Sequence, residues 1–193
     1  SDCGCNTGSG RRQQWRAPLR NALNWLRDRL APAYEEEMRR YADDPWKVRD
    51  AYIDVVLNRE PDNVEAFFAR NMRRELSRNE KVRVLSLLEM QRNAMFMFTS
   101  CGWFFDEISG IETTQILGYA GRAMQLAARE LGIGLEPELM KMLESAPSNI
   151  PEFRNGARVY ELFVKPARID LYNVLAHFAV SSLFNNHSEK MQI

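Results

Sequence analysis

The residues of this chain best suited to chemistry lie in one short stretch, 99–110, with the sequence TSCGWFFDEISG. Trp103, Phe104 and Phe105 stand there directly before two carboxylates, Asp106 and Glu107. Aromatic rings stack on the apolar C–H face of a sugar, and carboxylates accept hydrogen bonds from its hydroxyls. The structural alternative is that the rings fill the core while Asp106 or Glu107 caps the helix that follows. The stretch is therefore either a carbohydrate-contacting surface or a core plug.

Glycines near both ends of this stretch allow the backbone to bend sharply. Five bulky or charged residues in a row cannot all point the same way. We therefore expect Trp103 to be partly exposed at the mouth of a groove, with one of the two carboxylates beside it. We expect Phe104 or Phe105 to point into the protein and anchor the turn.

A second group of polar residues lies on the last expected helix, 167–184. Its apolar residues cover most of the circumference and leave a thin polar line that contains Asp170, Asn173 and His177. The spacing of three and four residues places these side chains on one helix face. They are expected to form another wall of the groove; the alternative is a hydrogen-bonded His177 without chemical function.

Metal and cofactor chemistry is not expected in this chain. Cys3 and Cys5 supply only half of a tetrahedral site, and neither they nor Cys101 have a histidine at ligand spacing. The sequence contains no glycine-rich phosphate loop, no His-Glu-x-x-His motif and no nucleophile elbow. We expect no bound metal and no cofactor.

Composition narrows the class of protein. The 193 residues contain 26 basic and 26 acidic side chains, so no net charge attracts nucleic acid or an anionic membrane. No run of 18 uninterrupted apolar residues is present, so no membrane-spanning helix is expected. Three cysteines do not form a disulfide framework, which favours the reducing cytoplasm.

Apolar periodicity and capping signals predict helices throughout. Asp44-Pro45, Glu60-Pro61 and the capping box Ser77…Glu80 each mark a helix start. Expected helices lie near residues 15–33, 45–56, 61–72, 79–98, 111–131, 136–143, 155–164 and 167–184. We predict an all-α fold, an irregular bundle of about seven to eight helices over residues 15–193, preceded by a flexible segment at 1–14. Pro32 is expected to kink or split the first helix.

Two glycines, Gly118 and Gly121, lie inside the expected helix 111–131. Each destabilises a helix by roughly 1 kcal/mol relative to alanine. Such glycines usually mark a close crossing by another helix.

Several segments carry a family resemblance: SDCGC at 1–5, WRAPLR at 15–20, LNWLRD at 23–28 and, above all, residues 99–123. They resemble the C-terminal helical domain, catalogued as domain of unknown function 3536, of bacterial proteins related to glycoside hydrolase family 57. In such proteins an N-terminal seven-stranded barrel carries the catalytic carboxylates, and the helical bundle closes one side of the cleft. Residues 101–106 are similar to a short family-57 motif, an aromatic and aspartate stretch that faces the active site.

The resemblance implies a non-catalytic helical domain, part of a larger protein, whose partners are the barrel and a glycan. Because the barrel is absent from this sequence, neither catalytic carboxylate is assigned here, and the isolated chain is expected to be inactive. Trp103, Asp106 and Glu107 are the implied substrate contacts, with Asp170, Asn173 and His177 as further candidates. The alternative function is a helical scaffold that stabilises the barrel or an assembly without touching substrate.

Overall fold

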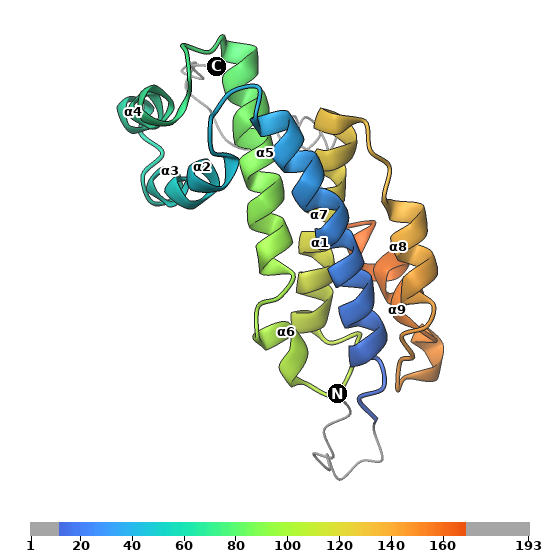
Figure 1. Ribbon diagram of the computed structural model, residues 1–193. Coiled ribbons are helices and arrows are strands. Elements are labelled where there is room, and N and C mark those ends of the chain that lie inside the picture. Colours follow the sequence, from blue (N-terminus) through green and yellow to red (C-terminus); the bar gives the residue numbers. More distant parts are fainter. Residues whose placement is uncertain (1–11, 169–193) are drawn as a thin grey trace, which may run out of the picture.

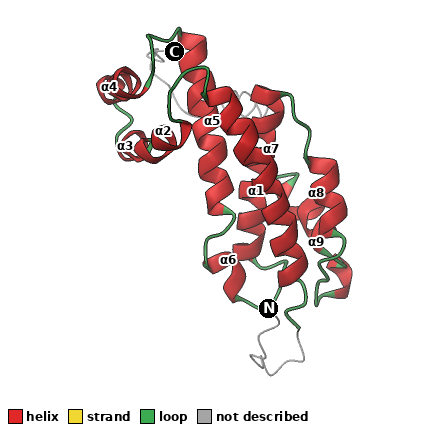
Figure 2. Ribbon diagram, in the orientation of Figure 1, coloured by secondary structure: helices red, strands yellow, loops and turns green. Residues whose placement is uncertain are grey.

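The computed structural model of the chain describes residues 12–168, and these residues are helical nearly throughout (Figures 1 and 2). The α-helices are α1 (Arg16–Met38), α2 (Pro45–Ala51), α3 (Ile53–Leu57), α4 (Pro61–Asn71), α5 (Arg78–Phe96), α6 (Cys101–Phe104), α7 (Ile111–Leu131), α8 (Glu136–Leu143) and α9 (Gly156–Val159). A 3₁₀ turn, η1 (Pro151–Phe153), and a π-helical turn, η2 (Tyr160–Val164), complete the described part. An isolated bridge between Pro147 and Asn155 is the β pairing present in this range. The predicted all-α fold is confirmed; α6 and α9 are only four residues long, which leaves seven longer helices.

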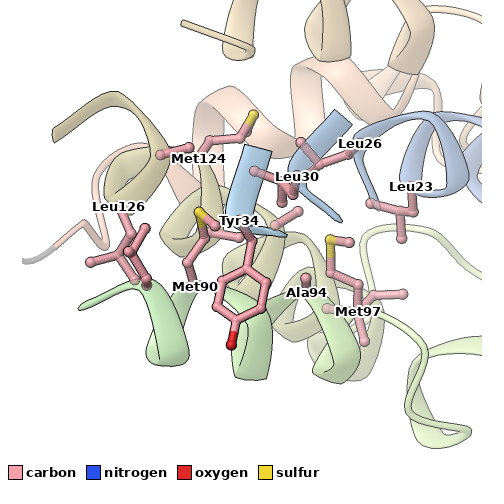
Figure 3. Close-up of a cluster of buried hydrophobic side chains, with 14 of the residues drawn as sticks. Leu23, Leu26, Leu30, Tyr34, Met90, Ala94, Met97, Met124 and Leu126 are labelled. Carbon is pink, nitrogen blue, oxygen red and sulfur yellow. The ribbon is translucent and has the colours of Figure 1, made fainter. Parts of the chain in front are cut away.

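Three long helices, α1, α5 and α7, lie side by side and form the body of the molecule, with α8 against α1 (Figure 1). Their apolar stripes meet in a continuous core. Figure 3 labels part of it: Leu23, Leu26, Leu30 and Tyr34 of α1, Met90, Ala94 and Met97 at α5, and Met124 and Leu126 of α7. Burial of these faces, rather than helix propensity, stabilises helices of this kind.

The capping signals read from the sequence are present. The Asp44 carboxylate accepts hydrogen bonds from the backbone N–H groups of Trp46 and Lys47, at 3.1 and 3.2 Å. Ser77 and Glu80 form the reciprocal capping box at the start of α5. Gly132 ends α7 in the left-handed conformation, with φ of 70°, which is favourable for glycine.

Helix α1 is longer than predicted and does not split at Pro32. Pro32 lies on the exposed side, whereas Tyr34 and Met38 extend the buried stripe by a further turn. The tertiary contacts of that stripe therefore offset the hydrogen bond that proline removes.

Helices α2 to α4, residues 45–71 (the α2–α4 arm), lie to one side of the upper part of α5 in Figure 1. The predicted helix 45–56 is divided at Tyr52, where the Tyr52 N–H bonds to the Arg49 carbonyl at 3.2 Å. The Tyr52 hydroxyl donates to the Glu89 carboxylate of α5 at 2.8 Å. This hydrogen bond attaches the junction between α2 and α3 to helix α5.

Some predictions concern residues outside the described range 12–168. These are nearly all of the predicted helix 167–184, with its polar line Asp170, Asn173 and His177, and the cysteines Cys3 and Cys5. Of the expected flexible segment 1–14, Arg12 lies within the structure, and its N–H and carbonyl bond to the Asn149 side chain, both at 2.9 Å. No helix within residues 12–168 has the length and apolar character needed to cross a membrane.

Candidate functional site

Residues 101–110, here called the aromatic turn, connect α5 to α7 and include the short helix α6 (Figure 1). Gly102 packs directly on α7: a Cβ atom at this position would lie 2.4 Å from Ile116 Cγ2 and 3.1 Å from the Glu112 carbonyl. The Thr113 hydroxyl donates to the Gly102 carbonyl at 2.9 Å in a buried hydrogen bond. The turn is thus pressed against α7 at a position where only glycine fits.

Phe104 and Phe105 both point outward. Their exposed fractions are 77% and 47%, and the rings meet edge to face, with centroids 5.4 Å apart. The prediction that one of them anchors the turn is wrong. Gly102 occupies the side that faces α7, and the fully buried Ile108 supplies the anchor instead.

Trp103 is partly buried, as predicted, but its ring is turned toward α1. It stacks on the fully buried Trp15 with centroids 6.4 Å apart and planes 19° apart. The Arg20 guanidinium lies 5.2 Å from the centre of the Trp103 ring. Trp103 therefore joins the turn to α1 and leaves the outer surface to the two phenylalanines.

Glu107 is buried, with an exposed fraction of 6%. Its Oε1 accepts hydrogen bonds from the Ser148 hydroxyl at 2.7 Å and the Ser109 N–H at 3.2 Å, and its Oε2 accepts one from the Asn149 N–H at 2.8 Å. These bonds hold the loop after α8 to the aromatic turn. Helix α7 has Gly110 as its N-cap and no side-chain cap, so the alternative role of Asp106 or Glu107 as its cap is not realised.

Asp106 has a half-buried side chain. Its backbone carbonyl accepts hydrogen bonds from Trp15 Nε1 at 3.2 Å and Asn149 Nδ2 at 2.8 Å. The Arg16 guanidinium donates to the Phe104 and Phe105 carbonyls at 2.7 and 3.0 Å. Three consecutive carbonyls are thus held by side chains from α1 and the loop after α8, so the backbone below the exposed rings is fixed.

Of the predicted site residues, Trp103 and Asp106 lie partly exposed in the turn, whereas Glu107 is enclosed. The exposed pair, Phe104 and Phe105, belonged to the predicted stretch but was assigned to the interior. Sequence reasoning did not identify Arg16 or Asn149 as the residues that hold the turn, and no local motif marks them.

A hollow that begins at Ile111, directly after the turn, runs along α7 rather than beside Trp103. This α7 groove has a volume of about 770 Å³. Its lining consists of Ile111, Thr114, Gln115, Gly118, Tyr119, Arg122 and Gln125 of α7, together with Phe163, Val164, Ala167 and Arg168. Trp103 and Asp106 are not among these residues.

Cys101 is an exposed free thiol, with its Sγ 3.7 Å from the Thr99 hydroxyl. Over the described range, no cluster of three or more His, Cys, Asp or Glu side chains has an arrangement that could hold a metal ion.

Comparison with known proteins gives one finding. No curated protein and no solved structure matches the chain significantly. One family profile, described as a domain of unknown function (DUF3536), matches residues 12–193. Because that match covers nearly the whole sequence, the chain belongs to the DUF3536 family.

Proposed function

We propose that this chain is a non-catalytic helical domain that contacts a glycan through its aromatic turn, on one side of the cleft of a catalytic barrel in the parent protein. The observation that supports it is the outward orientation of Phe104 and Phe105 on a backbone held by hydrogen bonds from the Arg16 guanidinium and the Thr113 hydroxyl. The resemblance to family-57-like proteins supplies the substrate class.

Large exposed apolar side chains on a fixed backbone are typical of a contact surface rather than of a loose loop. A ring that is already held in place loses little conformational freedom when a sugar stacks on it. The adjacent Asp106 is partly exposed, and in this proposal its carboxylate accepts hydrogen bonds from sugar hydroxyls. Trp103 contributes by holding α6 to Trp15 and Arg20 rather than by offering its own face.

The same geometry favours a non-catalytic role. Retaining glycoside hydrolysis uses two carboxyl groups about 5 Å apart across the scissile bond, with one of them free to act as nucleophile. Glu107 is enclosed and accepts three hydrogen bonds from the protein itself. Asp106 therefore has no second accessible carboxylate beside it in the turn, and the catalytic pair belongs to the barrel.

The test is calorimetric titration of the 193-residue chain with a panel of α- and β-linked oligosaccharides. We expect at least one class to bind, and Phe104→Ala to weaken that binding about 10-fold, or about 1.4 kcal/mol. Leu57→Ala is the matched control, because Leu57 is equally exposed at 79% but lies on α3 in the α2–α4 arm. Absence of binding across the panel, or equal binding by the Phe104 variant, would contradict the proposal.

A second candidate function is docking to the barrel without substrate contact. It is favoured by Ile111, the first residue of α7, which is 78% exposed directly after the aromatic turn. In the parent protein, Phe104→Ala and Ile111→Ala would then weaken the attachment of the barrel and lower the melting temperature. A glycan contact predicts instead a raised KM for Phe104→Ala at an unchanged melting temperature.

A further inference from the structure

Arg20 of α1 lies beside the aromatic turn, where two aromatic rings hold its guanidinium. The guanidinium carbon is 4.7 Å from the centre of the Phe98 ring and 5.2 Å from the centre of the Trp103 ring. Phe98 follows the end of α5 and Trp103 belongs to α6, so three segments meet at this side chain (Figure 1). Arg20 is nevertheless exposed to solvent. The rings therefore fix the guanidinium at the surface without enclosing it.

The charge of Arg20 has no acidic partner nearby. Among residues 12–168, no carboxylate forms an ion pair with Arg20 and no acceptor takes a hydrogen bond from it. An aromatic ring attracts a cation with its face and leaves the N–H donors of a guanidinium available. A guanidinium held in this way keeps the planar fork that binds a carboxylate through two parallel hydrogen bonds.

The face of α1 that carries Arg20 is basic. At intervals of four, four and three residues it contains Arg16, Arg20, Asn24 and Arg27, and this spacing places them on one side of the helix. No acidic residue belongs to this set. Asp28, the neighbour of Arg27 in the sequence, offsets the charge of Arg27 through an ion pair at 2.7 Å, so the uncompensated charge lies toward the aromatic turn.

Arg16 connects this basic face to the exposed rings. Its guanidinium donates to the Phe104 and Phe105 carbonyls, directly below the two rings. Arg20 follows one helical turn later, or about 6 Å along α1. A ligand that lies on the rings and extends along α1 therefore passes the Arg20 guanidinium.

We propose that Arg20 binds a carboxylate of the glycan, so that the ligand of the aromatic turn is an acidic oligosaccharide built from uronic acids. A carboxylate accepts two charge-assisted hydrogen bonds from one guanidinium, which a neutral sugar hydroxyl does not. This inference rests on the proposed glycan contact and specifies its substrate class.

Calorimetric titration of the full 193-residue chain tests this with short oligogalacturonate and oligomannuronate, each as the free acid and as the methyl ester. The ester keeps the sugars and linkages but removes the charge. At low ionic strength, we expect the wild type to bind at least one free acid about 10-fold more tightly than its ester. Arg20→Gln should lose this preference. Arg20→Lys should keep part of it, because lysine retains the charge but not the planar fork.

Arg29→Gln is the matched control. Arg29 is also exposed on α1 and lies over an aromatic ring, with its guanidinium carbon 6.0 Å from the centre of the Trp25 ring. It follows Arg20 by nine residues, which places it on the opposite side of the helix. We expect this variant to bind the acids and esters as the wild type does. Phe104→Ala and a short glutamate peptide complete the set of measurements.

Equal binding of acid and ester by the wild type overturns the inference and leaves the glycan contact standing. An acid preference that survives in Arg20→Gln, or falls equally in Arg29→Gln, also overturns it. So does a glutamate peptide that binds as tightly as the acidic glycan, because carboxylates without sugars then suffice. A preference that depends on Arg20 but not on Phe104 supports the carboxylate site and contradicts the role of the aromatic turn. Absence of binding by every glycan overturns both.

Discussion

The aromatic turn and the α2–α4 arm are both short-helix segments attached to the long helices, but they are attached by different kinds of contact. The turn is held through buried groups: the Gly102 contact with α7 and the enclosed Glu107 carboxylate. In the arm, α2 has a side-chain cap, and Phe67 and Phe68 of α4 are buried in the core. The arm also meets α5 through the Tyr52 hydrogen bond and through ion pairs such as Lys81 with Glu65. We infer that the turn depends on a few specific polar and steric contacts, whereas each polar contact between the arm and α5 contributes little.

The largest expected effect is at the centre of the turn. Glu107→Ala should lower the free energy of unfolding by about 2 kcal/mol, because partly buried donors at Ser148 and Asn149 lose their charged acceptor. Urea denaturation measures this, with Glu144→Ala, an exposed carboxylate on the neighbouring α8 end, as the control. A loss for Glu107→Ala no greater than that of the control would mean that the carboxylate does not hold the turn.

The next effect concerns the close contact of α6 with α7. Gly102→Ala should cost about 2 kcal/mol, because the new methyl group must displace Ile116 and approaches the Glu112 carbonyl. Gly134→Ala, in the loop between α7 and α8 with open space around it, should change stability by less than about 0.5 kcal/mol. Equal thermal melting of the two variants would show that the contact of α6 with α7 does not require glycine at position 102.

A smaller effect is expected where the arm joins α5. Tyr52→Phe should cost about 1 kcal/mol at pH 7 through loss of the hydrogen bond to Glu89. Burial, reinforced by the bond to Glu89, raises the pKa of Tyr52 above its ordinary value of 10.0. The folded state therefore retains a proton that the unfolded state releases, so the contribution of Tyr52 is complete below pH 10 and is lost as the pH rises above it.

Denaturation of both proteins between pH 7 and pH 11.5 checks that dependence. Tyr34 and Tyr160 also have pKa values raised by burial, so both proteins should lose stability above pH 10. The wild type should lose it more steeply than Tyr52→Phe, by up to about 1.4 kcal/mol per pH unit. Parallel curves would show that the Tyr52 hydroxyl is not buried against α5.

The smallest effect is expected at the surface of the arm. Lys81 pairs with Glu65 at 2.5 Å, and the Glu65 side chain is 60% exposed. Exposed pairs of this type contribute about 0.5 kcal/mol or less in physiological salt. Lys81→Ala should therefore shift the urea midpoint only slightly. A decrease in the free energy of unfolding above about 2 kcal/mol would show that this contact of the arm is as important as those of the turn.

The same comparison explains what could be predicted from the sequence. The helices of the arm begin with signals only a few residues long, such as Asp44-Pro45, and these were read correctly. The orientation of the turn depends on Ser148 and Asn149, which lie 41 and 42 residues beyond Glu107. Hydrophobicity favoured a buried phenylalanine, and nothing local indicated that Gly102 and Ile108 would occupy the inner side instead. The composition of the candidate surface was thus predictable, but the direction of each side chain was not.

Asn149 has a mechanical consequence. Its side chain bonds to both backbone groups of Arg12 and to the Asp106 carbonyl, and its N–H bonds to Glu107. Tension applied to the chain ahead of Arg12 would therefore load Asn149 and the aromatic turn before it reached the first turn of α1. The segment before α1 and the aromatic turn are therefore mechanically coupled. A displacement of that segment would be transmitted through Asn149 to the backbone that carries Phe104 and Phe105.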